Sequence, residues 1–170
     1  MRDDRQRWAP PRDRTAHVTA PGLTITPVTV ERLTLLSGPV ARQQTSLPLV
    51  EWPGLAHKDS YALSLRRDRV LEVNGPAHQD GWDEARSLAV STVTDGYAQV
   101  EISGANALSL LNRGADLDLR TPSRSVARLL FGLSVFLYRH GEEDIFRVHV
   151  AAGHKDALWH ALDDAATHIA

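Results

Sequence analysis

The sequence predicts an α+β fold in which antiparallel β-sheets pack with helices. Three observations point to this fold class. Short segments alternate apolar and polar side chains, as half-buried strands do, and other segments repeat apolar residues at helical spacing. Glycine, proline and asparagine separate these segments with turn chemistry. The order strand–helix–strand–strand–helix occurs twice, so we expect two pseudo-repeated β-α-β-β-α units, at about residues 22–92 and 93–170.

Strands of the first half are predicted from alternation. They are residues 23–26, 33–35, 61–66 and 69–73. Ser37-Gly38-Pro39 offers a helix start, because proline is tolerated in a first helical turn. Residues 74–76, Asn-Gly-Pro, close the strand pair.

A helix is predicted at residues 80–89. Helical spacing would place Trp82, Ala85 and Ala89 on one side, with Leu88 beside them. Core packing is then the expected role of Trp82.

Strands of the second half are predicted in the same way. They are residues 97–102, 125–131, 133–140 and 145–151. One helix starts at Ser103-Gly104 and stops at Gly114, which suits a C-terminal cap. The last helix covers residues 155–169, with Trp159 packed in the core. Its buried stripe consists of Leu158, Ala161, Leu162, Ala165 and Ile169.

Composition excludes several classes of function. Hydrophobic residues make up 42% of the 170, enough for a core without disulfides, and cysteine is absent. The formal net charge of -2 makes nucleic acid an unexpected partner. No apolar run reaches bilayer length, and residues 1–21 hold no signal-peptide core. We therefore expect a cytoplasmic protein that does not enter a membrane.

The N-terminal residues 1–21 are predicted to form a flexible arm, ahead of a single domain at residues 22–170. Such an arm orders on a partner if Trp8 anchors it and Arg12 and Arg14 pair with carboxylates. Trp52 lies in a turn-like connection. It either covers an edge of its own domain or anchors a partner, and the sequence leaves both roles open.

Chemistry-bearing motifs are missing from the sequence. His149, His154 and His160 do not have the spacing of a metal site, and no nucleophile elbow or glycine-rich nucleotide loop occurs. Asp116 and Asp118 are spaced to share one face of an extended stretch, which would suit a cation or a general base, but exposed loop carboxylates are the favoured interpretation. The sequence thus predicts no catalytic, cofactor-binding or metal-binding residue in this chain.

An ordered series of segments gives the chain a family resemblance. Residues 100–119 read VEISGANALSLLNRGADLDL: a strand, a Ser-Gly turn, a helix with Leu-Leu-x-x-Gly, then Asp-Leu. Downstream follow VFLYRH at 135–140, FRVHV at 146–150 and ALWHAL at 157–162. In order and spacing these segments resemble the gamma subunit of heterotetrameric sarcosine oxidases, and the strand pair from residue 61 matches more weakly.

The resemblance implies a fold similar to the folate-binding domain of aminomethyltransferases. It implies a non-catalytic assembly subunit of a flavin-dependent complex that oxidatively demethylates sarcosine or a related N-methyl amino acid. The expected partners are alpha, beta and delta subunits. In that family the alpha subunit binds NAD and folate, the beta subunit carries FAD and covalent FMN, and the delta subunit binds zinc.

Two segments depart from the family pattern. Residues 120–125 replace an aromatic-Pro-x-Gly turn, and residues 151–154 replace an Arg-Ser pair. A paralogous N-methyl amino acid oxidase or dehydrogenase is therefore the variant of this interpretation. The alternative function is a stand-alone folate-binding module, in which Asp116, Asp118 or Glu101 would hold the pterin ring.

Overall fold

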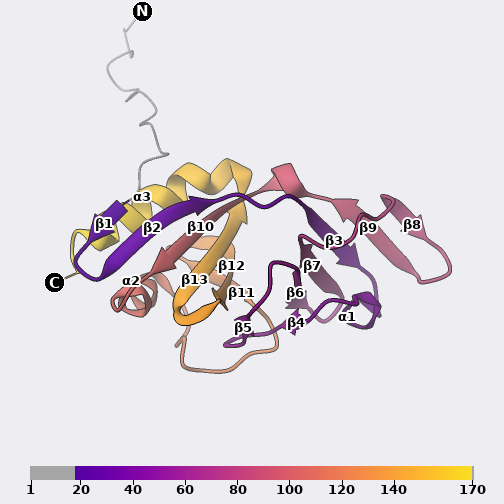
Figure 1. Ribbon diagram of the computed structural model, residues 1–170, viewed down its shortest axis with the longest axis horizontal. Coiled ribbons are helices and arrows are strands. Elements are labelled where there is room, and N and C mark those ends of the chain that lie inside the picture. Colours follow the sequence, from indigo (N-terminus) through magenta and orange to yellow (C-terminus); the bar gives the residue numbers. More distant parts are fainter. Residues whose placement is uncertain (1–17, 170) are drawn as a thin grey trace, which may run out of the picture.

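Two β-sheets lie one after the other along the long axis of the molecule in this computed structural model, which describes residues 18–169 (Figure 1). Mostly antiparallel strand pairing confirms the predicted α+β class. The proposed partner contacts Trp8, Arg12 and Arg14 lie outside the described residues.

Within residues 18–169 the larger sheet has seven strands and combines strands from the start of the described chain with strands from its second half. In spatial order its strands are β1 (Val18–Ala20), β2 (Leu23–Val28), β10 (Tyr97–Ser103), β13 (Glu142–Ala151), β12 (Leu133–His140) and β11 (Ala127–Leu130), with β5 (Leu55–Ala56) pairing parallel to β12. β1 falls inside the predicted arm. It pairs with β2, with Val18 opposite Ile25, so the ordered sheet begins before residue 22.

The smaller sheet has six strands in the described chain and comes from the first half of the sequence. Its spatial order is β4 (Leu49–Val50), β6 (Tyr61–Arg66), β7 (Arg69–Val73), β3 (Leu33–Ser37), β9 (Leu88–Thr92) and β8 (Gly81–Asp83). The strand pair predicted at residues 61–66 and 69–73 is confirmed as the antiparallel β6–β7 hairpin, whose two-residue turn is Arg67-Asp68. Asn74-Gly75 follows β7 and does not join the two strands.

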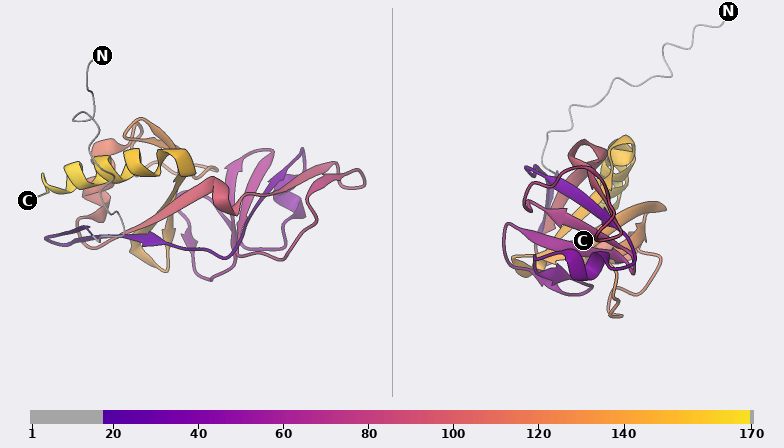
Figure 2. Two further views of the ribbon diagram at one scale, coloured as in Figure 1. Left: turned by 90° about the horizontal axis from the view of Figure 1, so that it is seen from above. Right: turned by 90° about the vertical axis from the view of Figure 1, so that its right-hand side faces the viewer.

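Two helices, α2 (Ala107–Gly114) and α3 (Lys155–Ala166), cover one face of the larger sheet (Figure 2). Their buried side chains share one core with Phe146, Val148 and Val150 of β13. The short helix α1 (Ala41–Gln44) lies by the smaller sheet, and single 3-10 turns occupy Thr94–Gly96 and Ala152–His154.

Strand β12 contributes to two cores because its side chains alternate between faces. Val135 and Leu137 pack in the core under the helices, whereas Tyr138 and Phe136 pack with the smaller sheet. This second cluster joins the two sheets.

The helix predicted at residues 80–89 is wrong: β8 and β9 form a hairpin there. Alternate residues of β9, Leu88 and Val90, enter the core, and Ser87 in the turn has φ 49°, which a right-handed α-helix does not allow. Asp83 closes the turn by accepting a hydrogen bond from the backbone N–H of Arg86 at 3.0 Å. The predicted core residue Trp82 is instead 60% exposed.

Gly104, just after β10, is expected to tolerate no side chain. Its φ is +109°, and a Cβ atom would lie 2.4 Å from the carbonyl oxygen of Gly22. Gly104→Ala should lower the free energy of unfolding by about 2–4 kcal/mol, because strain and overpacking add. Urea unfolding measures this. In the control Gly153→Ala, nothing lies within 4 Å of the added atom, and a similar loss there would contradict the explanation.

Candidate functional site

A buried chain of hydrogen bonds crosses the junction between the sheets. The hydroxyl of Tyr61 on β6 lies 2.6 Å from that of Tyr138 on β12. The Tyr138 hydroxyl lies 2.8 Å from Nε2 of His149 on β13. All three side chains are buried, so the two hydroxyls and Nε2 of His149 depend on one another for hydrogen bonding, whereas Nδ1 of His149 has no partner among the described residues.

An ion pair lies next to this series of hydrogen bonds, at the Tyr61 end. Nε of Arg147 donates to the Glu101 carboxylate at 3.1 Å, and its Nη1 lies 3.4 Å from the Tyr61 hydroxyl. The Glu101 carboxylate therefore already has an ion-pair partner, Arg147, within its own polypeptide. The predicted alternation of β13 is confirmed here, since Arg147 and His149 face away from the helices.

Burial shapes the ionisation of these groups. It raises the pKa of the Tyr138 hydroxyl well above its ordinary value and also raises the pKa of Tyr61. For His149, burial and the nearby Arg147 guanidinium lower the pKa to about 3. Tyr138 and His149 are thus neutral near pH 7, and this part of the network links the sheets without a buried charge.

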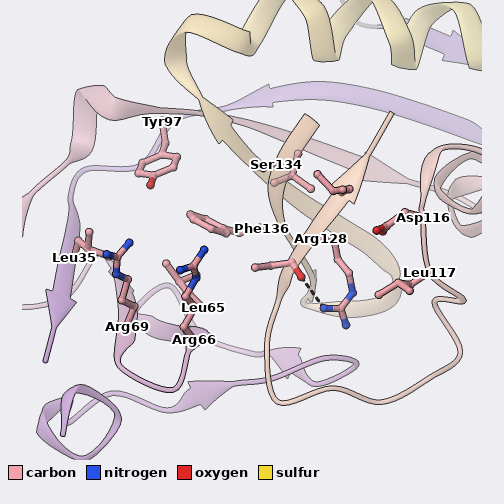
Figure 3. Close-up of a pocket in the computed structure, with 13 residues that line it drawn as sticks. Leu35, Leu65, Arg66, Arg69, Tyr97, Asp116, Leu117, Arg128, Ser134 and Phe136 are labelled. Carbon is pink, nitrogen blue, oxygen red and sulfur yellow. Dashed lines mark hydrogen bonds between the residues drawn. The ribbon is translucent and has the colours of Figure 1, made fainter. Parts of the chain in front are cut away.

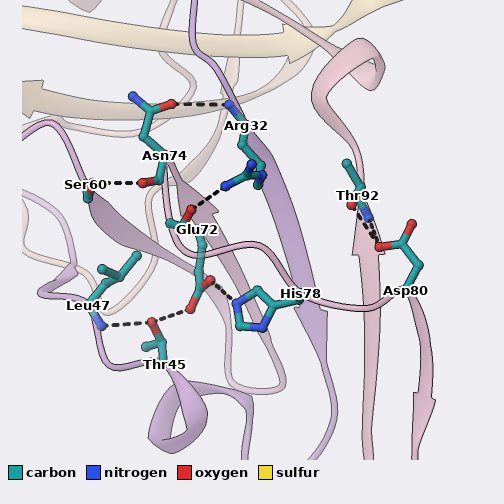
Figure 4. A network of polar contacts seen from close by, with 10 residues as sticks. Arg32, Thr45, Leu47, Ser60, Glu72, Asn74, His78, Asp80 and Thr92 are labelled. Atoms are coloured by element: carbon teal, nitrogen blue, oxygen red, sulfur yellow. Dashed lines mark hydrogen bonds and ion pairs between the residues drawn. The ribbon is translucent and has the colours of Figure 1, made fainter.

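A second polar network fixes the loop that follows β7 (Figure 4). The buried Glu72 carboxylate accepts a hydrogen bond from the Thr45 hydroxyl at 2.7 Å and lies 2.8 Å from Nε2 of His78. Asn74 accepts from the backbone N–H of Glu31 at 2.9 Å. These contacts tie three separate segments together, which is a structural role.

An open groove of about 400 Å³ lies between the β6–β7 hairpin and the β11–β12 hairpin (Figure 3). Its floor is apolar, with Leu35, Leu65 and Phe136, and its rim is charged. The charged side chains are Arg66, Arg69, Arg128 and Asp116. Walls from both sheets therefore make the groove, and its chemistry suits an anionic ligand with an apolar part.

Trp52 belongs to the core of its own chain. Its side chain is 2% exposed, its indole N–H donates to the carbonyl of Leu119 at 2.9 Å, and its ring stacks on Phe146. Of the two roles that the sequence left open, this burial favours covering its own domain. A partner cannot reach the Trp52 side chain in this conformation.

The predicted carboxylates do not converge. Asp116 lines the groove, whereas Asp118 is exposed and pairs with the guanidinium of Arg120 at 2.9 Å. In the part of the chain that the structure describes, no group of three or more His, Cys, Asp or Glu side chains could hold a metal ion. Among the described helices, none is long and apolar enough to cross a membrane.

Comparison with known proteins gives one family and one fold. The model of the "Sarcosine oxidase, gamma subunit family" matches residues 56–168, more than half of the chain. A solved chain of "Heterotetrameric Sarcosine Oxidase from Corynebacterium sp. U-96 in complex with pyrrole 2-carboxylate" is similar with a TM-score of 0.68 at 18% identity. The match covers 88% of this chain and 86% of that chain, and at this identity it shows the fold alone. No curated protein matches significantly.

Removing the Tyr138 hydroxyl is expected to weaken the junction. Tyr138→Phe leaves His149 Nε2 and the Tyr61 hydroxyl without this buried partner, which should lower the free energy of unfolding by about 1–3 kcal/mol. Denaturant unfolding measures the change. Tyr97→Phe is the matched control, because no hydrogen bond of the Tyr97 hydroxyl is found among the described residues. Equal effects of the two changes would contradict the role given to Tyr138.

Acid is expected to destabilise the fold through His149. The folded-state pKa of about 3 lies below the ordinary value of about 6.5, so the unfolded state binds the proton more readily between these values. The contribution is complete above about pH 6.5 and declines as the pH falls. Lowering the pH from 7 to 5 should therefore reduce the free energy of unfolding by about 2 kcal/mol.

The readout is the difference in pH dependence between the protein and His149→Gln. The variant should lose less stability between pH 7 and pH 5, whatever its starting stability. His154→Gln, at an exposed position, serves as the control. An unchanged slope in His149→Gln would refute the assignment.

Proposed function

Because the chain belongs to the sarcosine oxidase gamma subunit family, we propose that it is the gamma subunit of a multisubunit flavin-dependent oxidase or dehydrogenase. The complex would oxidatively demethylate sarcosine or a related N-methyl amino acid. The observation that carries the proposal is the family match over residues 56–168, which includes the β6–β7 hairpin, α2, α3 and the polar junction.

The partners in this proposal are alpha, beta and delta-like subunits, and they hold the redox machinery. FAD, FMN, NAD, folate and zinc are assigned to them, and none to this chain. The chain itself contributes surface and shape, in the cytoplasm as the sequence suggests. Its exposed large apolar side chains fit a chain that buries surface against others: Trp82 at 60%, Leu117 at 62% and Leu129 at 43%.

The proposal includes a duplicated, aminomethyltransferase-like architecture. Neighbouring strands follow the order β9–β3–β7–β6 in one sheet and β2–β10–β13–β12 in the other. In both sheets a Ser-Gly turn follows the second of these strands. A Cβ atom on Gly38 would lie 2.4 Å from the Ser87 carbonyl oxygen, as one on Gly104 would from that of Gly22.

These two contacts support the duplication because both partners occupy the same place. Ser87 and Gly22 both sit in hairpin turns with positive φ, and each precedes a strand whose first residue is a buried leucine. The two units then correspond, although their edge hairpins hold different places in the sequence. The β1–β2 hairpin precedes the other strands of its unit, whereas the β8–β9 hairpin follows the other strands of its unit.

The alternative of a stand-alone folate-binding module draws no support from the geometry. Glu101 and Asp118 are engaged by arginines of the same chain. Only Asp116 of the three candidates lines the groove.

Co-expression with the larger subunits tests the proposed function. The full chain should co-purify with them as a stable complex that oxidises sarcosine or another N-methyl amino acid, followed by substrate-dependent peroxide release or dye reduction. Expressed by itself, the chain should be poorly soluble or inactive. A soluble monomer that ignores those subunits would end the assembly role, and turnover by the lone chain would end the non-catalytic one.

A further inference from the structure

We propose that the groove between the β6–β7 and β11–β12 hairpins receives an extended acidic segment of a partner subunit, which also inserts an apolar side chain. This proposal rests on the proposed function, since it names where a partner binds. Four features of the groove carry it: an unpaired arginine couple, a third arginine held in place, an exposed leucine pair and the available space.

Arg66 and Arg69 form the unpaired couple. They lie directly opposite each other at the end of the β6–β7 hairpin, and both line the groove. Like charges in opposite positions of a β-ladder are destabilising. Within residues 18–169 neither guanidinium has a hydrogen-bond or ion-pair partner, so a carboxylate between them would relieve the repulsion.

Arg128 supplies positive charge from the opposite wall. Its Nη1 donates to the carbonyl oxygens of Ser125 at 2.9 Å and Ala127 at 2.7 Å, and its guanidinium lies 5.8 Å from the centre of the Trp52 ring. Partial burial lowers the pKa of Arg128, while Asp116 acts in the other direction. The cation is thus held in place before a ligand arrives, which favours binding.

The balance of charge at the groove is positive. Three arginines face one aspartate there, although the whole chain has a formal net charge of -2. Because the arginines come from both walls, an anionic segment lying along the groove can contact each in turn (Figure 3). Guanidinium groups bind carboxylates through paired hydrogen bonds.

An apolar strip accompanies these charges. Leu117 and Leu129 line the groove and are 62% and 43% exposed, and Phe136 forms its floor. The volume of about 400 Å³ lies in the range of about 300–1,000 Å³ that small ligands fill, so a segment fits and a folded domain does not. The occupant needs an apolar side chain between its carboxylates.

Charge argues against the chain's own N-terminal residues as this occupant. Residues 1–17 contain five arginines and three aspartates, which gives them the same sign as the groove. An acidic segment of a partner subunit has the complementary sign, and this complementarity decides between the two.

Charge reversal tests the proposal in the co-expressed complex. The double variant R66E/R69E should bind the partner subunits on the order of tenfold more weakly, with the wild-type advantage shrinking as salt is raised. The matched control is R67E, which has the same change of charge per residue in the same hairpin but does not line the groove. It should assemble like the wild type.

The outcomes separate this proposal from the proposed function. If the wild type fails to assemble, the proposed function fails. If the wild type assembles and R66E/R69E does so equally well, or if R67E weakens assembly as much, only the groove proposal is overturned.

Cross-linking identifies the occupant without relying on a charge-reversed variant. A photoreactive benzoylphenylalanine at Leu117, in the assembled complex, should capture a partner peptide that carries Asp or Glu beside an apolar residue. Capture of residues 1–17 of the same chain, of a second copy or of a segment without carboxylates would overturn the proposal. So would the absence of any cross-link in a complex that has formed.

Discussion

Packing of β12 between two layers is the constraint on which the rest of the structure depends. Val135 and Leu137 lie in the core beneath the helices, while Phe136 and Tyr138 lie against the smaller sheet. One strand therefore belongs to both cores. Separating the sheets would expose apolar surface and break the Tyr61–Tyr138 hydrogen bond in the same step, so we expect the two sheets to unfold together.

The same junction places the groove. Phe136, which packs with the smaller sheet, also forms the groove floor, and the groove walls come from one sheet each. The relative position of Arg66 and Arg128 is thus set by the packing of Tyr138 and its neighbours. A surface built in this way is rigid only while the junction is intact, which would couple the proposed partner binding to the stability of the fold.

Local patterns predicted much of the fold, and long-range contacts account for what they missed. The β6–β7 hairpin could be predicted because two strand-like segments flank the two residues Arg67-Asp68, and Asn74 marks the end of the second segment. At residues 80–89 the spacing of Trp82 suits a helix, but the buried alternation of Leu88 and Val90 decides for a strand. Tyr61 and Tyr138 are 77 residues apart, so no local pattern could pair them. The opposition of Arg66 and Arg69, however, follows from a two-residue turn and could have been predicted.

Arg66 and Arg69 are distinguished by their position, because they lie opposite each other and both line the groove. Arg42, Arg86, Arg120 and Arg147 each have a carboxylate partner among the described residues, whereas the other described arginines, Arg66 and Arg69 among them, have no ion-pair partner there. An exposed arginine in water costs the fold little, and a surface ion pair adds only about 0–1 kcal/mol. Leaving these two arginines without a carboxylate partner therefore loses little stability beyond the repulsion between them. Their charge gains value when a partner excludes water from the groove, because a carboxylate then interacts with them at a lower effective dielectric.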